Sequence, residues 1–158
     1  MAMDRISKLP IIGPIIRHRF SKFGAVGLSG TLVNLSVLFV GQEIIFKDIH
    51  PIETRLNFSL ALAIFLATIN NYLWNRNWTW GDRKGKTRYG FFLQMGQYFV
   101  ACGLAIGIQF GFTILLAKFV HYMIANIISI ILAAIFNYLL NDTWTFSENL
   151  RRKLQQIR

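Results

Sequence analysis

Four stretches of this 158-residue chain contain no Asp, Glu, Lys or Arg. They are Phe23–Gln42, Leu56–Asn75, Tyr89–Ala117 and Tyr122–Asn141, and each has at least 20 residues. About 20 apolar residues in a helix cross the hydrocarbon core of a bilayer. Charged residues make up only 15% of the chain, against about 25% in soluble domains, and the helices of a soluble all-α protein would show polar faces. We therefore expect an all-α integral membrane protein with four transmembrane helices.

The distribution of basic residues predicts the orientation. Of the 17 Lys and Arg residues, 14 lie in residues 1–22, in the loop between the second and third stretches, and in the tail; the other three are Lys47, Arg55 and Lys118. Cytoplasmic segments carry the excess of Lys and Arg, so both termini are predicted to be cytoplasmic. The net charge of +10 would suggest nucleic acid in a soluble protein, but the topology explains it here, and we expect no nucleic-acid partner.

Three segments are expected along the chain. Residues 1–22 form an N-terminal segment whose isoleucines stand beside basic residues, which is typical of interfacial helices. Residues 23–146 form the four-helix transmembrane domain. Residues 147–158 form a tail with Leu150, Leu154 and Ile157 at helical spacing. An amphipathic helix on the cytoplasmic membrane surface and a frayed, solvated tail both fit this last segment.

One ten-residue segment occurs twice. Residues 71–80 read NYLWNRNWTW, and residues 137–146, which lie 66 positions later, read NYLLNDTWTF. The first and third stretches correspond more weakly at a shift of 75, which aligns Phe23 with Tyr98 and Asn34 with Gln109. The chain is therefore predicted to be two helical hairpins that point the same way, as a parallel repeat.

No catalytic or metal-binding pattern is present. The three histidines lie at membrane edges, without Cys or carboxylate at metal-ligand spacing. The chain has a single cysteine, Cys102, and lacks the G-x-x-x-x-G-K-[ST] nucleotide motif. We expect no enzyme activity, cofactor or metal. The four stretches also lack an internal ionisable residue, which argues against a proton-coupled exporter.

Intramembrane amides are the informative polar residues. An amide without a partner in hydrocarbon costs several kcal/mol, so each must bond to another helix, to water or to a substrate. Single amides fit hydrogen bonds between helices, whereas the doubled Asn-x-x-x-Asn pairs favour a polar substrate cavity. Arg76 follows Asn75 and can reach a phosphate in the headgroup layer, although snorkelling to lipid is an alternative. Trp78, Trp80 and Trp144 fit an interfacial aromatic belt.

Glycines mark close-packing faces. Gly103, Gly107 and Gly111 form two overlapping G-x-x-x-G steps, which let helix backbones approach closely in lipid. They fit packing within one subunit or self-association. Because four helices enclose little volume, we expect a homo-oligomer, with a dimer favoured.

Three sequence features form a recognisable pattern: Phe23, Gly24 and Gly27 in the first stretch, the intramembrane Asn34, and the Asn-Tyr-x-x-Asn-Arg-x-Trp-Thr-aromatic segment that begins at Asn71. In these residues the chain resembles the GtrA-like family of small four-span membrane proteins. The match covers about residues 20–146, and Trp80 departs from the phenylalanine usual in the family. The resemblance implies transfer of polyprenyl-phosphate-linked sugars from the cytoplasmic to the outer leaflet of the bacterial inner membrane, for glycosylation of surface polysaccharides.

A site follows from this resemblance. We expect Arg76, Asn71 and Asn75 to receive the lipid phosphate. The predicted path of the sugar is lined by Asn34, Gln109, Asn137 and Asn141. Arg76 is replaced by Asp142 in the second copy, so the phosphate site is expected in the first.

Two other functions remain open. The chain fits an adaptor that anchors a membrane glycosyltransferase, which makes such an enzyme a further expected partner, and less well a small multidrug-type exporter. The polyprenyl-phosphate-sugar and the surrounding membrane lipids are the partners expected of the favoured function.

Overall fold

The computed structural model describes residues 12–149, with side-chain surroundings from His18 onward. Within this range the regular elements are helical, apart from one antiparallel bridge between Thr87 and Glu148. The helices long and apolar enough to cross a membrane are His18–Ile45, Ile52–Thr79, Phe91–Leu116 and Tyr122–Thr145. The prediction of an all-α fold with four membrane-length helices is confirmed. Residues 1–11 of the expected interfacial segment and the tail from residue 150 lie outside the described residues.

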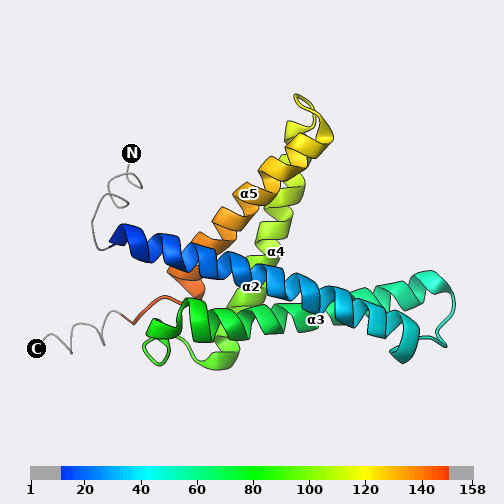
Figure 1. Cartoon of the computed structure of the whole chain (residues 1–158), viewed down its shortest axis with the longest axis horizontal. Coiled ribbons are helices and arrows are strands. Elements are labelled where there is room, and N and C mark those ends of the chain that lie inside the picture. Colours follow the sequence, from blue (N-terminus) through cyan, green and yellow to red (C-terminus); the bar gives the residue numbers. More distant parts are fainter. Residues whose placement is uncertain (1–11, 150–158) are drawn as a thin grey trace, which may run out of the picture. The chain divides into compact units, whose positions relative to one another are not determined.

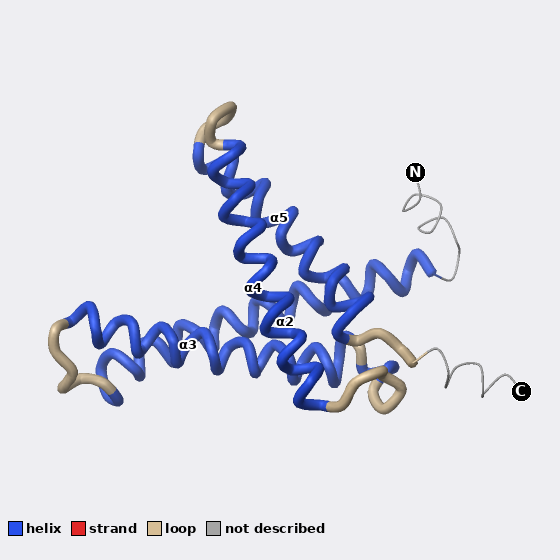
Figure 2. The backbone as a smooth tube through the Cα atoms, turned by 180° about the vertical axis from the view of Figure 1, so that it is seen from behind, coloured by secondary structure: helices blue, strands red, loops and turns tan. Residues whose placement is uncertain are grey.

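The chain forms two compact units that divide between Asp82 and Arg83. In the first hairpin, α2 (Ile12–Val40) continues into a π-helical turn, η1 (Gly41–Ile45). The return helix α3 (Ile52–Trp74) continues into the π-helical turn η2 (Asn75–Thr79). Figures 1 and 2 both show α2 and α3 side by side along much of their length. Pro14 lies in the first turn of α2, where its missing N–H breaks no helical hydrogen bond.

The second hairpin has the same plan. Helix α4 (Phe91–Leu116) packs on α5 (Tyr122–Leu140), which continues into the π-helical turn η4 (Asn141–Thr145). A 3₁₀ turn, η3 (Gly81–Arg83), precedes the loop that leads into α4. That loop pairs with the segment after η4, because Arg88 N donates to Ser147 O at 3.1 Å and Asn149 N donates to Lys86 O at 3.0 Å.

The repeat in the sequence is also a repeat in packing. Helix α3 buries Ser59, Ala63, Ala67 and Tyr72, and α5 buries Ala125, Ser129, Ala133 and Tyr138, each 66 positions later. The three small residues of each set are spaced four apart, so they lie on one helix face and let the partner helix approach closely. The matched burial supports the division into two equivalent hairpins.

Large apolar side chains cover the outside of the helices. Leu28, Leu32 and Phe39 of α2 are 72%, 68% and 65% exposed, as is typical of side chains that face lipid. On α4, a Cβ atom at Gly103, Gly107 or Gly111 would meet no atom within 4 Å. The packing of α4 on α5 therefore does not depend on these glycines, and self-association through them stays a prediction.

Candidate functional site

Both Asn-Tyr-x-x-Asn segments end in a π-helical turn at their second asparagine. Trp80 N donates to Asn75 O at 2.8 Å, and Phe146 N donates to Asn141 O at 2.8 Å. In the first hairpin the Thr79 hydroxyl also donates to Asn75 Oδ1 at 2.7 Å. Asn75 is only 1% exposed and Thr79 only 2%. Asn75, predicted to receive the phosphate, therefore has a clear structural role inside the hairpin.

The aromatic residue after each π-helical turn is buried. Trp80 packs edge-on against Phe23 with ring centroids 5.9 Å apart, and Phe146 packs in the same way on Tyr98 at 6.2 Å. Trp80, predicted in an interfacial aromatic belt, is only 1% exposed, so its ring lies inside the hairpin. Trp78 is 44% exposed and Trp144 is half-buried, so these two rings have more access to lipid headgroups.

A hollow of about 230 Å³ lies between α2 and α3, and its lining includes two asparagines and two threonines. We call it the amide groove. Its lining residues are Gly27, Gly30, Thr31, Asn34, Ile64, Ala67, Thr68 and Asn71. The structure thus brings Asn34, predicted on the sugar path, together with Asn71, predicted at the phosphate. The sequence analysis missed Thr31 and Thr68, although each stands three residues before a groove asparagine and so on the same helix face.

Gly30 makes room for the Asn71 amide. A Cβ atom at position 30 would lie 2.6 Å from the Asn71 carboxamide carbon, closer than packed atoms allow. Asn71 Oδ1 is buried and accepts no hydrogen bond within the described part of the chain. An unsatisfied buried carbonyl is costly, and a ligand hydroxyl or a water molecule in the groove would remove this cost.

In the second hairpin, the corresponding amide already has hydrogen-bond partners within the hairpin. Ala105 takes the place of Gly30, and Asn137 that of Asn71. Asn137 Oδ1 accepts from Asn141 Nδ2 at 2.8 Å, and Asn137 Nδ2 contacts Cys102 Sγ at 3.9 Å. The carbonyl that is open in the first hairpin is therefore already bonded in the second.

Gln109 belongs to a separate polar cluster of the second hairpin. Its Nε2 donates to Asn126 Oδ1 at 3.4 Å, and the Thr113 hydroxyl donates to Gln109 O at 2.8 Å. Gln109 stands seven residues after Cys102 on α4, about 10 Å along the helix. The predicted path residues of this hairpin thus form two clusters, one at Gln109 and one at Asn137 and Asn141.

Arg76 and Asp142, which occupy equivalent positions, have different partners. Arg76 Nη1 donates to the Tyr72 hydroxyl at 3.1 Å and is half-buried. Asp142 Oδ1 pairs with Arg83 Nη1 at 3.0 Å, and Arg83 also donates to Asp142 O at 2.8 Å and Phe146 O at 3.2 Å. Asp142 thus differs from Arg76 because it helps to hold Arg83 against the end of η4.

Replacing Arg83 by alanine is expected to destabilise the second hairpin. The change removes charge-assisted hydrogen bonds worth about 1–3 kcal/mol where they are buried, and the partial exposure of both side chains, 16% for Arg83 and 28% for Asp142, places the effect in the lower half of that range. Thermal melting in detergent measures it, with the exposed Lys86→Ala as control. Equal melting temperatures for the two variants would contradict the bracing role.

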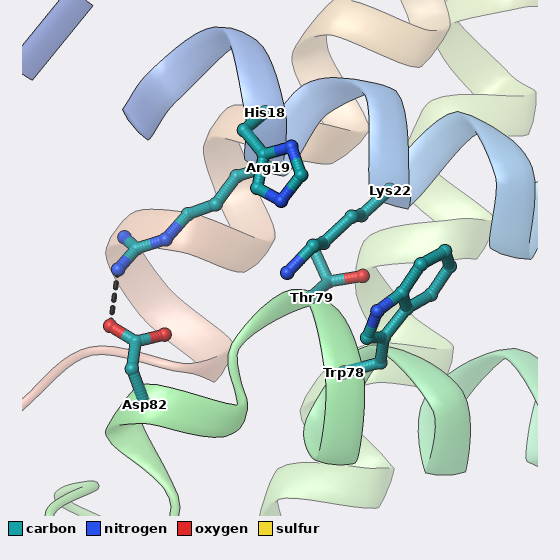
Figure 3. Close-up of a pocket in the computed structure, with 6 residues that line it drawn as sticks. All are labelled: His18, Arg19, Lys22, Trp78, Thr79 and Asp82. Atoms are coloured by element: carbon teal, nitrogen blue, oxygen red, sulfur yellow. Dashed lines mark hydrogen bonds and ion pairs between the residues drawn. The ribbon is translucent and has the colours of Figure 1, made fainter. Parts of the chain in front are cut away.

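A second hollow, of about 330 Å³, lies where α2 begins its membrane-length part and α3 ends. We call it the basic cavity. Figure 3 shows its lining residues, which are His18, Arg19, Lys22, Trp78, Thr79 and Asp82. Arg19 is ion-paired with Asp82, and Lys22 Nζ lies 5.6 Å from the centroid of the Trp78 ring. The sequence analysis used the basic residues of segment 1–22, Arg19 and Lys22 among them, only for the orientation and the interfacial character of that segment. Only the return of α3 brings Trp78 and Asp82 beside them.

Comparisons with known proteins agree with this architecture. The family model for the GtrA/DPMS transmembrane domain matches residues 22–146. A dolichol-phosphate mannosyltransferase of Pyrococcus furiosus is 33% identical over 130 residues. The match covers 80% of this chain but 34% of that protein, so the chain spans about a third of its relative's length. Because the family model covers four-fifths of the chain and all four membrane-length helices, the protein belongs to the GtrA/DPMS transmembrane-domain family.

Proposed function

We propose that this protein moves a polyprenyl-phosphate-linked monosaccharide from the cytoplasmic to the outer leaflet of a bacterial inner membrane, for glycosylation of surface polysaccharide. The amide groove is the observation that carries the proposal. It offers the Asn34 and Asn71 amides at one place on a membrane-length hairpin. The hydroxyls of Thr31 and Thr68 donate to Gly27 O and Ile64 O, so their oxygens are available as acceptors. Sugar hydroxyls need such partners, because an unpaired polar group in hydrocarbon costs several kcal/mol. The family and the relative named for dolichol phosphate support the same substrate class.

Transfer of this kind requires no bond to be made or broken, so we propose that the protein is not an enzyme. The sugar would exchange water for the groove amides while the polyprenyl chain stays in lipid. Consumption of the sugar outside would then draw transport in one direction. Arg76 stays the predicted phosphate ligand at the end of α3, and Asn137, Asn141 and Gln109 stay predicted contacts on the second hairpin.

Replacing both Asn34 and Asn71 by leucine tests the proposal. The double variant Asn34→Leu/Asn71→Leu removes both groove amides, and we expect flipping of a labelled polyprenyl-phosphate-hexose in vesicles to fall by about tenfold or more, since losing hydrogen bonds to an otherwise buried ligand costs over about 1.4 kcal/mol. Asn57→Leu is the matched control, because Asn57 is on the same helix and exposed. Unchanged flipping by the double variant would refute the assignment of the groove.

An adaptor function is the second candidate. The matched relative is named a mannosyltransferase and is about three times as long as the region it shares with this chain, which favours a glycosyltransferase as a partner. An adaptor needs no groove. If the Asn34→Leu/Asn71→Leu variant lost transport in vesicles yet supported wild-type surface glycosylation in cells and still copurified with the enzyme, the adaptor function would be the correct one.

A further inference from the structure

The basic cavity carries charge that the fold itself does not require. At the shift of 75 that relates α2 to α4, Arg19 corresponds to Gln94 and Lys22 to Gln97. These glutamines are 0% and 8% exposed, so the second hairpin accommodates neutral amides at both positions. The neighbouring ring contacts, Phe23 with Trp80 and Tyr98 with Phe146, are nearly identical in the two hairpins. Packing therefore does not explain why the first hairpin has two cations here.

The charges of the side chains that line the basic cavity do not balance. Arg19, whose side chain is 18% exposed, is ion-paired with Asp82. Among the described residues Lys22 makes no ion pair, and its ammonium lies over the Trp78 ring. An aromatic face attracts a cation but does not neutralise it. The cavity thus offers an ammonium group with three N–H donors and a net positive charge, which match a group bearing a single negative charge.

The cavity lies at the end of a membrane-length hairpin, at the level where lipid headgroups are expected. Figure 3 shows Arg19 and Lys22 extending from α2 toward the end of α3, with the indole of Trp78 beside Lys22. The amide groove begins at Gly27, five residues after Lys22, or about 8 Å along α2. A phosphate bound at Lys22 would leave an attached hexose close to the start of the groove.

From this charge and this position we infer that the basic cavity is a binding site for the phosphodiester of a membrane lipid, with Lys22 as its main ligand and Arg19 as the second cation. The inference deepens the proposed function and rests on it for the identity of the lipid. It places the phosphate on α2, in contrast to the predicted contact with Arg76, whose guanidinium bonds Tyr72 and does not line the cavity.

The test replaces Arg19 and Lys22 by glutamine, which the second hairpin has at both equivalent positions. The variant Arg19→Gln/Lys22→Gln in neutral-lipid nanodiscs is titrated with a short-chain polyprenyl-phosphoryl-glucose and with the matched polyprenyl glucoside, which lacks phosphate. We expect wild type to prefer the phosphate-bearing lipid by about tenfold or more and the variant to bind both lipids alike. The exposed Lys86→Gln is the control and should keep the preference, and Arg76→Gln tests the alternative phosphate ligand. Melting temperatures show whether the variant is folded.

Competing ligands show which chemical group the basic cavity recognises. Competition by phosphatidylglycerol would show a site for lipid phosphodiesters in general, competition by inorganic phosphate would show that the lipid is not needed for recognition, and either would support a phosphate site. A preference retained by folded Arg19→Gln/Lys22→Gln, or lost in Arg76→Gln instead, would overturn the inference. Because binding is measured at equilibrium without transport, the Asn34→Leu/Asn71→Leu variant should keep the preference even where flipping fails, so the two proposals can fail independently.

Discussion

Replacing Gly30 by leucine is expected to destabilise the first hairpin and to abolish transport. A side chain at this position meets the Asn71 amide at once, since even a Cβ atom would lie 2.6 Å from its carboxamide carbon. Overpacking of this kind costs about 1–3 kcal/mol. The leucine would also fill the amide groove that Gly30 lines. Thermal melting in detergent and flipping in vesicles measure the two effects.

A control variant and a compensating variant test this prediction. Gly24→Leu is the control, because a Cβ atom at Gly24 would meet nothing within 4 Å, and we expect it to melt like wild type. Adding Asn71→Ala to Gly30→Leu frees the space that the leucine needs, so stability should recover while transport stays lost. Wild-type flipping by Gly30→Leu would contradict the role of the groove, and full stability without the second change would contradict the close contact.

Replacing Asn75 by alanine is expected to destabilise the protein by about 1–3 kcal/mol, because the buried Thr79 hydroxyl then loses its acceptor. The two side chains are joined at 2.7 Å and are almost fully buried. A double-mutant cycle with Thr79→Val should show coupling, since the second change removes the hydroxyl that the first leaves unsatisfied. Denaturation in detergent measures all three variants.

The exposed Asn77→Ala, two residues away, is the control for this cycle. Asn77 Nδ2 donates to Leu73 O at 2.8 Å on the surface of the helix, so its loss should matter little. If Asn75→Ala melted like wild type but bound polyprenyl-phosphoryl-glucose more weakly, Asn75 would be a ligand of the phosphate, as the sequence suggested, and its bond to Thr79 would be secondary.

Most of the architecture could be predicted because its signals are local. Charge-free stretches of membrane length specify helices wherever they occur, and each predicted stretch lies within a helix or differs from it by at most two residues. The repeat at 66 residues was visible as identical residues, and the buried small residues of α3 and α5 recur at the same shift. The candidate site was predicted only in part: Asn34 and Asn71 do share a groove, but Asn75 is involved in the fold, and Lys22 was assigned no ligand.

The sequence by itself determined that this is a membrane protein of four helices in two similar hairpins, because hydropathy and repetition depend only on the order of residues. Tertiary structure decided which polar groups meet. The pairs Gly30 with Asn71 and Arg19 with Asp82 join residues far apart in the chain, and nothing local specifies which faces of α2 and α3 come together. The same packing left Asn71 Oδ1 without a hydrogen bond in the described part of the chain and bonded Asn137 Oδ1 to Asn141, although the two asparagines occupy equivalent positions in the repeat.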